Sequence, residues 1–160
     1  MSKYLTLHDT HHFIPMVLRQ TTGRDGETIR VYRPIVHNLI FIRVDQGLEQ
    51  LRETLKGCPF TYSIYCKYGH SEQWCEISDE EMADLRLICD LGYQDTAFAS
   101  REEYELSIGS FVRVTHGPMK GLKGKVVRKK KKYYLMRPIG ELAFMVCVSR
   151  WMCKPLEEER

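Results

Sequence analysis

The sequence predicts an α+β fold, with helices on an N-terminal antiparallel sheet followed by a small C-terminal β-barrel. The hydrophobic pattern is the first reason. Residues 1–91 mix apolar runs of strand length with two helical stripes, whereas short strands and Gly-rich turns follow from Ile108 onward. Charge is the second reason, because residues 1–100 carry 10 Lys/Arg against 14 Asp/Glu, and residues 101–155 carry 13 against 4. We therefore expect two modules with different partners.

Composition argues against several classes of protein. Hydrophobic residues make up 43% of the chain, which suffices for a buried core. No apolar run approaches the ~18 residues of a membrane span, and residues 1–4 lack the apolar core of a signal peptide. These features predict a cytoplasmic protein without a membrane partner. The six cysteines form no C-x-x-C pair, which favours reduced thiols over a zinc ribbon or disulfides.

Three strands are expected in the first 44 residues. Residues 13–18 form a strand with Pro15 at an edge or a bulge. The Gly-containing turn at residues 22–26 joins it to an alternating strand at residues 28–32, as in a hairpin. Residues 39–44 are almost continuously apolar, which is typical of a strand that lies centrally in a sheet or is covered on both faces.

Two helices and a further strand follow. The first helix begins at Asp45, which can cap it, and ends at Gly57, where a left-handed C-cap is expected. Residues 60–68 then alternate in part, as a strand does. The second helix begins at a capping box in which Glu81 reaches back to the amide of Ser78. The inward stripes of the two helices are Leu48, Leu51 and Leu55, and then Met82, Leu85, Ile88 and Cys89.

These elements predict two domains. In the first, residues 1–91, helices pack on an antiparallel sheet. Residues 92–106 are mainly polar and read as a linker. The second domain spans residues 107–155, and residues 156–160 form a charged tail.

A motif of alternating valines and spaced glycines opens the second domain. Val112 and Val114 point to the same side of a strand, into the barrel. Gly117 and Pro118 form a turn, in which Gly117 is free to adopt positive φ. A tight return is permitted by Gly121 and Gly124, after which Val126 re-enters the core.

Residues 109–126 resemble the KOW motif, whose family form has a Gly, two alternating valines, Gly-Pro-Phe, two spaced glycines and a Val. Met119 stands in place of the usual aromatic residue and keeps an apolar anchor. The resemblance implies an SH3-like barrel of the kind found in NusG-type transcription factors and in some ribosomal proteins. The alternative is another SH3-like barrel with similar turns.

The first domain resembles the N-terminal domain of NusG. Residues 34–44 are similar to the family's Pro-x-x-x-x-Tyr-x-Phe-Val strand. Asn38 and Phe41 match positions used there, and Leu39 stands where an aromatic residue is common. The resemblance covers residues 11–155. Its His-Asn-Leu-Ile-Phe variant is most similar to the Upx-type antiterminators of capsular polysaccharide operons in Bacteroides-like bacteria.

One part of the family pattern is missing. Members begin with a Trp-Tyr strand and a helix before the segment that matches residues 13–18, and only residues 1–12 precede it here. Three explanations stay open: the chain is truncated, residues 4–7 replace the strand, or a second chain supplies it in a dimer. A missing central strand leaves unpaired backbone edges.

The resemblance implies a transcription elongation or antitermination factor without enzymatic activity or cofactor. Its first domain binds the coiled-coil clamp helices of the largest subunit of RNA polymerase. Residues 50–54 correspond to the segment that reaches the opposite jaw or the non-template strand, and three alternatives stay open for the barrel: contact with Rho, with a ribosomal protein, or with neither. The apolar residues carried over for this contact, which are named below, have an alternative role as core residues. For Leu85 the core role is the favoured interpretation. The polymerase-binding residues carried over are Asn38, Leu39, Phe41, Ile77, Met82 and Leu85.

The basic residues of the second domain surround a hairpin whose tip is the run at residues 129–132. A lysine near a phosphate releases counterions, which gives salt-sensitive and sequence-tolerant affinity, and an adjacent tyrosine can stack on an exposed base. The alternative is a solvated turn with its tyrosines in the core. One of the neighbours Tyr133 and Tyr134 faces inward in either case. The residues predicted to bind DNA or RNA are Lys120, Lys123, Lys125, Arg128, Lys129, Lys130, Lys131, Lys132 and Tyr133.

Two further interpretations follow from the same residues. A KOW-type protein that binds ribosomal or other RNA directly, without polymerase, is the rival function. His8, His11 and His12 have the i, i+3, i+4 spacing of metal ligands on a helix, but one short cluster near a terminus is weak support, so no metal site is predicted. No phosphate loop, nucleophile elbow or carboxylate-pair motif occurs, so no catalytic site is predicted.

Overall fold

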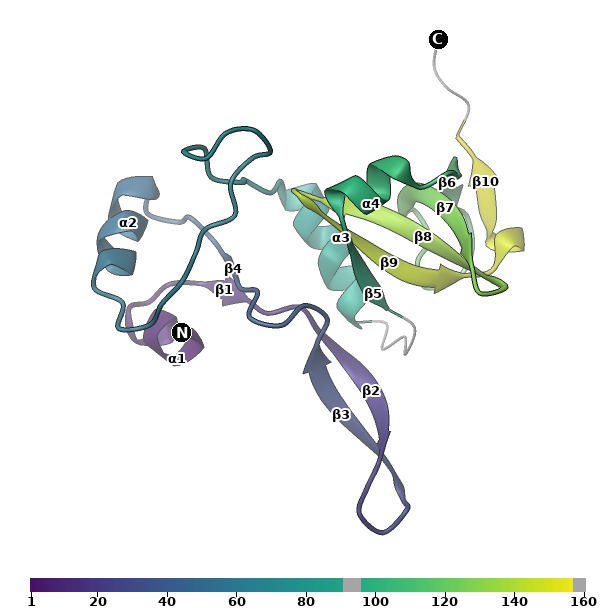
Figure 1. Cartoon of the computed structure of the whole chain (residues 1–160), viewed down its shortest axis with the longest axis horizontal. Coiled ribbons are helices and arrows are strands. Elements are labelled where there is room, and N and C mark those ends of the chain that lie inside the picture. The colour runs from purple at the N-terminus through teal and green to yellow at the C-terminus, as the bar shows by residue number, and fades with distance from the viewer. Residues whose placement is uncertain (91–95, 157–160) are drawn as a thin grey trace.

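The structure is a computed structural model that describes residues 1–90 and 96–156. Short helices and strands occupy the N-terminal half, and most of the strand residues lie in the C-terminal half (Figure 1). The helices are α1 (Ser2–Leu7), α2 (Leu48–Lys56), α3 (Asp79–Asp90), α4 (Arg101–Leu106) and the 3-10 turn η1 (Arg150–Met152). The strands are β1 (His12–Phe13), β2 (Met16–Thr22), β3 (Thr28–Pro34), β4 (Phe41–Ile42), β5 (Ala97–Ser100), β6 (Ser110–Val114), β7 (Lys123–Lys129), β8 (Lys132–Ile139), β9 (Leu142–Val148) and β10 (Cys153–Pro155).

The C-terminal half forms a six-stranded antiparallel sheet, which we call the C-terminal sheet. Its strand order is β10-β6-β7-β8-β9-β5, and it is open, with β10 and β5 at its edges. The predicted short strands after Ile108 are confirmed. Together with the helices, this sheet confirms the predicted α+β class. The predicted β-barrel is not confirmed, because the edge strands β10 and β5 do not pair with each other and the sheet stays open.

Helices cover both faces of the C-terminal sheet. Leu85 and Ile88 of α3 are fully buried in a cluster that includes Leu135, whereas Tyr104 of α4 packs on a second cluster that includes Met136. Successive side chains of a strand point to opposite faces, so α3 and α4 lie on opposite sides (Figure 1). The sheet is therefore the middle layer of three.

Polar contacts attach α3 to the sheet. The guanidinium of Arg137 lies 2.7 Å from the carboxylate of Asp84, and both side chains are largely buried. The amide of Gly140 donates to the Glu81 carboxylate at 3.1 Å. The same carboxylate accepts from the Ser78 amide at 2.9 Å, and the Glu81 amide donates to the Ser78 hydroxyl, so the predicted capping box is confirmed.

The predicted N-terminal sheet is replaced by two separate two-stranded sheets, β1–β4 and β2–β3. The apolar run at residues 39–44 contributes only the two-residue strand β4, and Val44 is exposed. The predicted strand at residues 60–68 is wrong, since only Cys66 forms an isolated bridge, to Trp74. A strand needs a partner backbone as well as an alternating pattern, and these segments have almost none.

The predicted hairpin is confirmed as β2–β3. Its register pairs Met16 with Pro34 and Thr22 with Thr28, and Gly26 has φ +77° in the turn. Val17, near the base, is fully buried in the cluster that also contains Leu85, Ile88 and Leu135, which we call the main core. The rest of the hairpin projects away from the molecule (Figure 1).

Helices α1 and α2 share a small separate core. Leu5 packs with Leu51 and Leu55, which confirms two residues of the predicted stripe of α2 and shows that residues 4–7 are not a substitute strand. The caps differ from the prediction. Gly47 occupies the N-cap of α2, while the Asp45 carboxylate binds His11 and Arg43 at 2.8 Å each, and Gly57 has φ −79°, which is not left-handed.

The described part of the predicted linker is structured. Residues 97–100 form β5, which pairs with β9, and residues 101–106 form α4. The C-terminal sheet therefore begins ahead of residue 107, and residues 91–95 and the tail residues 157–160 lie outside the described structure. None of the helices described is both long and apolar enough to cross a membrane.

Candidate nucleic-acid interface

The β6–β7 turn has the backbone that its sequence predicts. Val112 and Val114 are buried, and Gly117 has φ +78° at the turn. Met119 is only 3% exposed, so it serves as the expected apolar anchor. A Cβ at Gly124 would collide with the carbonyl oxygen of Met136 on β8, which explains why the return to the sheet requires glycine there.

This turn contacts η1. The amide and the hydroxyl of Thr115 both donate to the carbonyl oxygen of Met152, at 2.7 and 3.0 Å. The ring of His116 lies 6.3 Å from that of Trp151, centroid to centroid, and His116 Nδ1 lies 2.8 Å from the Thr115 hydroxyl. The β6–β7 turn thereby fixes the position of the segment that follows β9.

The basic run forms the tip of the β7–β8 hairpin, as predicted. Lys129 pairs with Lys132 across the strands, and Lys130 and Lys131 occupy the turn with φ +48° and +64°. Both turn lysines are exposed. The ammonium of Lys129 lies 3.1 Å from the carboxylate of Glu103 in α4, so part of its charge is already balanced.

Two arginines lie beside Tyr133. The guanidinium carbons of Arg128 and Arg150 are 5.9 and 5.8 Å from the centre of its ring. Tyr133 is half-buried against the main core, and Tyr134 packs on the opposite face, as the alternation of a strand requires. Tyr133 therefore supports guanidinium groups, whereas the sequence predicted that it stacks on bases.

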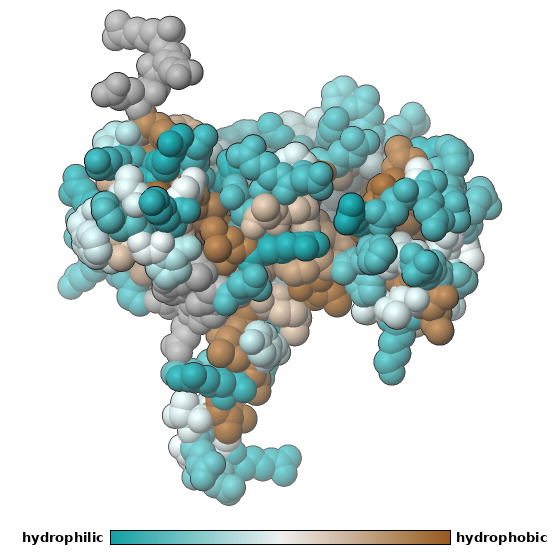
Figure 2. All heavy atoms as spheres, turned by 180° about the vertical axis from the view of Figure 1, so that it is seen from behind, coloured by the Kyte–Doolittle hydropathy of each residue, from teal (hydrophilic) through white to brown (hydrophobic). Residues whose placement is uncertain are grey.

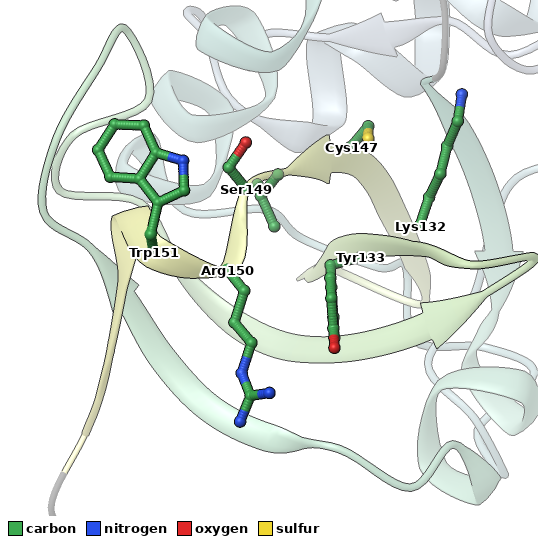
Figure 3. A pocket seen from close by; sticks show the side chains of 7 residues that line it. Lys132, Tyr133, Cys147, Ser149, Arg150 and Trp151 are labelled. Atoms are coloured by element: carbon green, nitrogen blue, oxygen red, sulfur yellow. The ribbon is translucent and has the colours of Figure 1, made fainter.

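A shallow hollow lies at this end of the C-terminal sheet (Figure 3). Trp151 and Arg150 are neighbours in η1, yet their side chains point to different sides of the ribbon, and Arg150 extends alongside Tyr133. The indole of Trp151 is 72% exposed. The hollow is lined by Lys132, Tyr133, Cys147, Val148, Ser149, Arg150 and Trp151.

The prediction for Lys125 is wrong. Its side chain is only 8% exposed, and its ammonium group donates to the carbonyl oxygens of Tyr104 at 2.8 Å and Ser107 at 3.1 Å. The ammonium also lies 4.3 Å from the centre of the Tyr104 ring. Lys125 therefore secures the end of α4 and offers no charge to a phosphate. Lys120 and Lys123 are exposed, but Lys123 begins β7, at the opposite end of the strand from the basic tip.

The residues predicted to bind polymerase have different degrees of exposure. Leu85 is fully buried, which agrees with its alternative reading as a core residue. Asn38 is exposed, with φ +62°, in the segment between β3 and β4. Residues 50–54, expected to reach the opposite jaw, lie within α2. Four members are half-buried and pack against the main core: Leu39, Phe41, Ile77 and Met82.

The histidines and cysteines do not gather into a site in the described residues. No group of three His, Cys, Asp or Glu side chains suited to a metal occurs in residues 1–90 and 96–156. His11 binds Asp45, and the His12 ring lies 2.6 Å from the Ser2 hydroxyl. Cys89 is a buried free thiol, and burial together with the nearby charge of Asp90 raises its pKa to about 12.

Sequence reasoning missed Arg150, Trp151 and His116. A signal was present, because Trp151 adjoins an arginine and follows the apolar run of β9 without belonging to it. His116 had no comparable signal, since only the contact between its turn and η1 brings it to Trp151.

Comparison of the chain with known proteins gives no relative. No protein-family model, curated protein or solved structure matches it.

Proposed function

We propose that the chain is a cytoplasmic, non-enzymatic, NusG-like transcription factor that binds RNA polymerase and suppresses pausing or termination. The observation that carries the proposal is the KOW-like turn, in which Gly117 has positive φ, Met119 is a buried anchor and Gly124 meets the neighbouring strand. In this proposal the open C-terminal sheet is a KOW domain of the SH3-like barrel class. The similarity of residues 34–44 to the NusG strand assigns the factor to transcription.

The proposed polymerase contact is apolar. Phe41 and Met82 keep part of their surface accessible while packing on the main core, as do Leu39 and Ile77. Figure 2 shows hydrophobic side chains in the middle of the face opposite to that of Figure 1. Such a surface suits the tip of the clamp helices of the largest polymerase subunit.

The proposed mechanism requires no bond-making chemistry. A factor that binds the clamp only in its closed position shifts the population toward the elongating polymerase. The similarity of the His-Asn-Leu-Ile-Phe segment to Upx-type antiterminators is the reason for proposing that the factor serves a polysaccharide operon. Rho or a ribosomal protein is the proposed partner of the C-terminal sheet.

A specific observation favours the rival function, direct RNA binding without polymerase. Residues 34–90 contain α2, α3 and the two-residue strand β4, and α3 shares one core with the C-terminal sheet and with Val17 of the hairpin, without an N-terminal sheet of its own. The N-terminal part thus lacks, among its described residues, the larger sheet that the resemblance implies for polymerase binding. The basic hairpin of the C-terminal sheet, in contrast, is fully paired up to its tip.

Capture of the chain by purified core RNA polymerase separates the two functions. We expect Phe41→Glu and Met82→Glu to abolish capture, because a charge cannot be buried against an apolar helix tip. Ile29→Glu is the matched control, since Ile29 is an exposed apolar residue on the β2–β3 hairpin. Circular dichroism establishes that each variant is folded. Unchanged capture by both folded variants, combined with complete competition by RNA, would replace the polymerase proposal with the rival.

A further inference from the structure

We propose that η1 and the basic hairpin tip form a binding site for single-stranded nucleic acid. In this site an unpaired base stacks on Trp151, and Arg128 and Arg150 hold the neighbouring phosphates. The inference rests on the nucleic-acid contact assigned to the hairpin tip and adds to it the strandedness of the ligand and the residues that read it.

Trp151 presents an exposed indole on a backbone that is fixed by hydrogen bonds. Trp151 is 72% exposed, although burying a ring of this size is strongly favourable. Its backbone is fixed, because the Met152 amide donates to Ser149 and the Met152 carbonyl accepts two hydrogen bonds from Thr115. A stacking platform needs both properties: an accessible face, and a position that costs little entropy on binding.

The two arginines of the site lack a carboxylate partner among the described residues. Neither Arg128 nor Arg150 forms an ion pair with a carboxylate of the described chain, whereas Arg101 and Arg137 are each paired with two. Both guanidinium groups instead lie within 6 Å of the Tyr133 ring, which holds their charge without neutralising it. Planar guanidinium groups that are not neutralised by a carboxylate are well suited to bind phosphate oxygens.

The surroundings of Trp151 are positively charged and open. Lys130 and Lys131 add positive charge at the hairpin tip, and the hollow beside Trp151 is open rather than enclosed. An open surface with one exposed ring and several cations fits a flexible polyanion better than a compact ligand. In a duplex the base faces are covered by stacking, so the indole has nothing to stack on, whereas a single strand offers them.

Binding of the full-length chain to labelled oligothymidine, oligouridine and a DNA duplex, followed by fluorescence anisotropy, tests the site. We expect Trp151→Ala to weaken binding of the single strands by about fivefold or more and to leave duplex binding unchanged. Trp151→Phe keeps an aromatic face and should restore most of the affinity. The matched control is Tyr68→Ala, which removes a ring of similar exposure, 73%, from another part of the molecule and should change nothing.

A second readout reports on the indole directly. The chain has two tryptophans, so Trp74→Phe leaves Trp151 as the only one. Its fluorescence should be quenched by oligothymidine or oligouridine and not by the duplex. A consistent preference for one of the two oligonucleotides would identify DNA or RNA as the source of the strand.

The outcomes separate this inference from the proposed function. Equal losses for single strands and duplex in Trp151→Ala, or no quenching, overturn the stacking site but leave the phosphate contact of the hairpin intact. Competition by polyglutamate as effective as that by oligothymidine would assign the site to an acidic protein partner and overturn the inference. Absence of all nucleic-acid binding overturns both this site and the hairpin contact, while polymerase capture is decided independently.

Discussion

At the scale of single residues, the same side-chain type serves opposite purposes on one strand. Lys125 is buried and donates to two carbonyl oxygens, whereas Lys123 and Lys129 on the same strand are exposed. Burial of an ammonium group is costly unless carbonyls or carboxylates surround it. Lys125 meets this condition because the end of α4 and the rings of Tyr104 and Phe111 lie against it. Its charge therefore stabilises the fold and is not available to a ligand.

Replacing Lys125 should consequently affect stability and spare binding. Lys125→Met leaves the carbonyls of Tyr104 and Ser107 without their donor, and we expect a loss of about 1–3 kcal/mol in the free energy of unfolding. Urea denaturation measures the loss, with Lys123→Met as the exposed control on the same strand. Nucleic-acid affinity of the folded variant should match that of the unaltered chain. A marked drop in affinity without any loss of stability would return Lys125 to the binding surface.

At the scale of secondary-structure elements, the backbone of the β7–β8 turn is more strained than that of a two-residue turn with favourable residues. Lys130 and Lys131 both have positive φ, which costs a residue with a side chain about 1–2 kcal/mol, whereas Asn-Gly adopts this two-residue turn readily. Lysines at these positions weaken the hairpin and increase the charge at its tip. This is the pattern expected where binding, rather than stability, determines the residues.

The double replacement Lys130→Asn with Lys131→Gly tests this interpretation. The hairpin should become more stable by about 1 kcal/mol, seen as a higher urea midpoint, because the turn loses its backbone strain. The slope of log affinity against log salt for single-stranded DNA should fall by roughly 1.5, because two phosphate contacts are lost. An unchanged slope would place the phosphates elsewhere on the sheet.

The N-terminus of α3 is a second element with a testable role. Burial by itself raises the pKa of Glu81, but hydrogen bonds from the amides of Ser78 and Gly140, and from the Ser78 hydroxyl, outweigh it and lower the pKa below its usual 4.5. Folding thus stabilises the ionised carboxylate of Glu81 relative to the unfolded chain. Its contribution to stability is complete above pH 4.5 and is lost as the pH falls through the lower folded value.

Glu81→Gln should therefore reduce stability at neutral pH and flatten its dependence on acid. We expect a loss of about 0.5–1 kcal/mol at pH 7, since a neutral amide is a weaker acceptor at a helix N-terminus. The difference from the unaltered chain should shrink below pH 4.5. Glu76→Gln, an exposed neighbour, is the control for thermal unfolding across this range. A difference that stays constant with pH would show that the charge of Glu81 has no role.

At the scale of the whole molecule, α3 belongs to the C-terminal sheet although it lies in the predicted first domain. Leu85 and Ile88 fill the same cluster as Leu135 and Phe144, and Arg137 holds Asp84. Among the described residues, the β2–β3 hairpin joins this core near its base through Val17, and Arg19 donates to the Thr96 carbonyl oxygen at 2.6 Å. An isolated two-stranded hairpin is marginally stable in water. Stability should consequently be distributed unevenly along the chain.

Hydrogen exchange of backbone amides measures this distribution. Amides in the middle of β8 and β9 should exchange slowest, and those of α3 should match them, because helix and sheet expose the same core when they separate. Amides at the far end of the β2–β3 hairpin, around residues 20–30, should exchange fastest among the strands. Exchange of α3 at the rate of that hairpin would support the predicted division at residue 91 and place α3 in an independent N-terminal domain.

Local patterns determined much of this protein. The alternation of Val112 and Val114, the glycine turn at Gly117, the capping box of Ser78 and Glu81, and the basic hairpin tip follow from the residues themselves. Each depends on contacts within a few positions along the chain, where steric limits and hydrogen bonding leave few choices. The α+β class follows from the same local information.

Only the tertiary structure decided which surfaces meet. Burial of Lys125, attachment of α3 to the C-terminal sheet and the approach of His116 to Trp151 join segments that are distant in sequence. The apolar runs at residues 39–44 and 60–68 show the same limit, because an apolar pattern specifies which side chains seek burial and not which strand lies beside them. Pairing and burial are long-range properties, and the packing of the whole chain selects among partners that the sequence leaves equally acceptable.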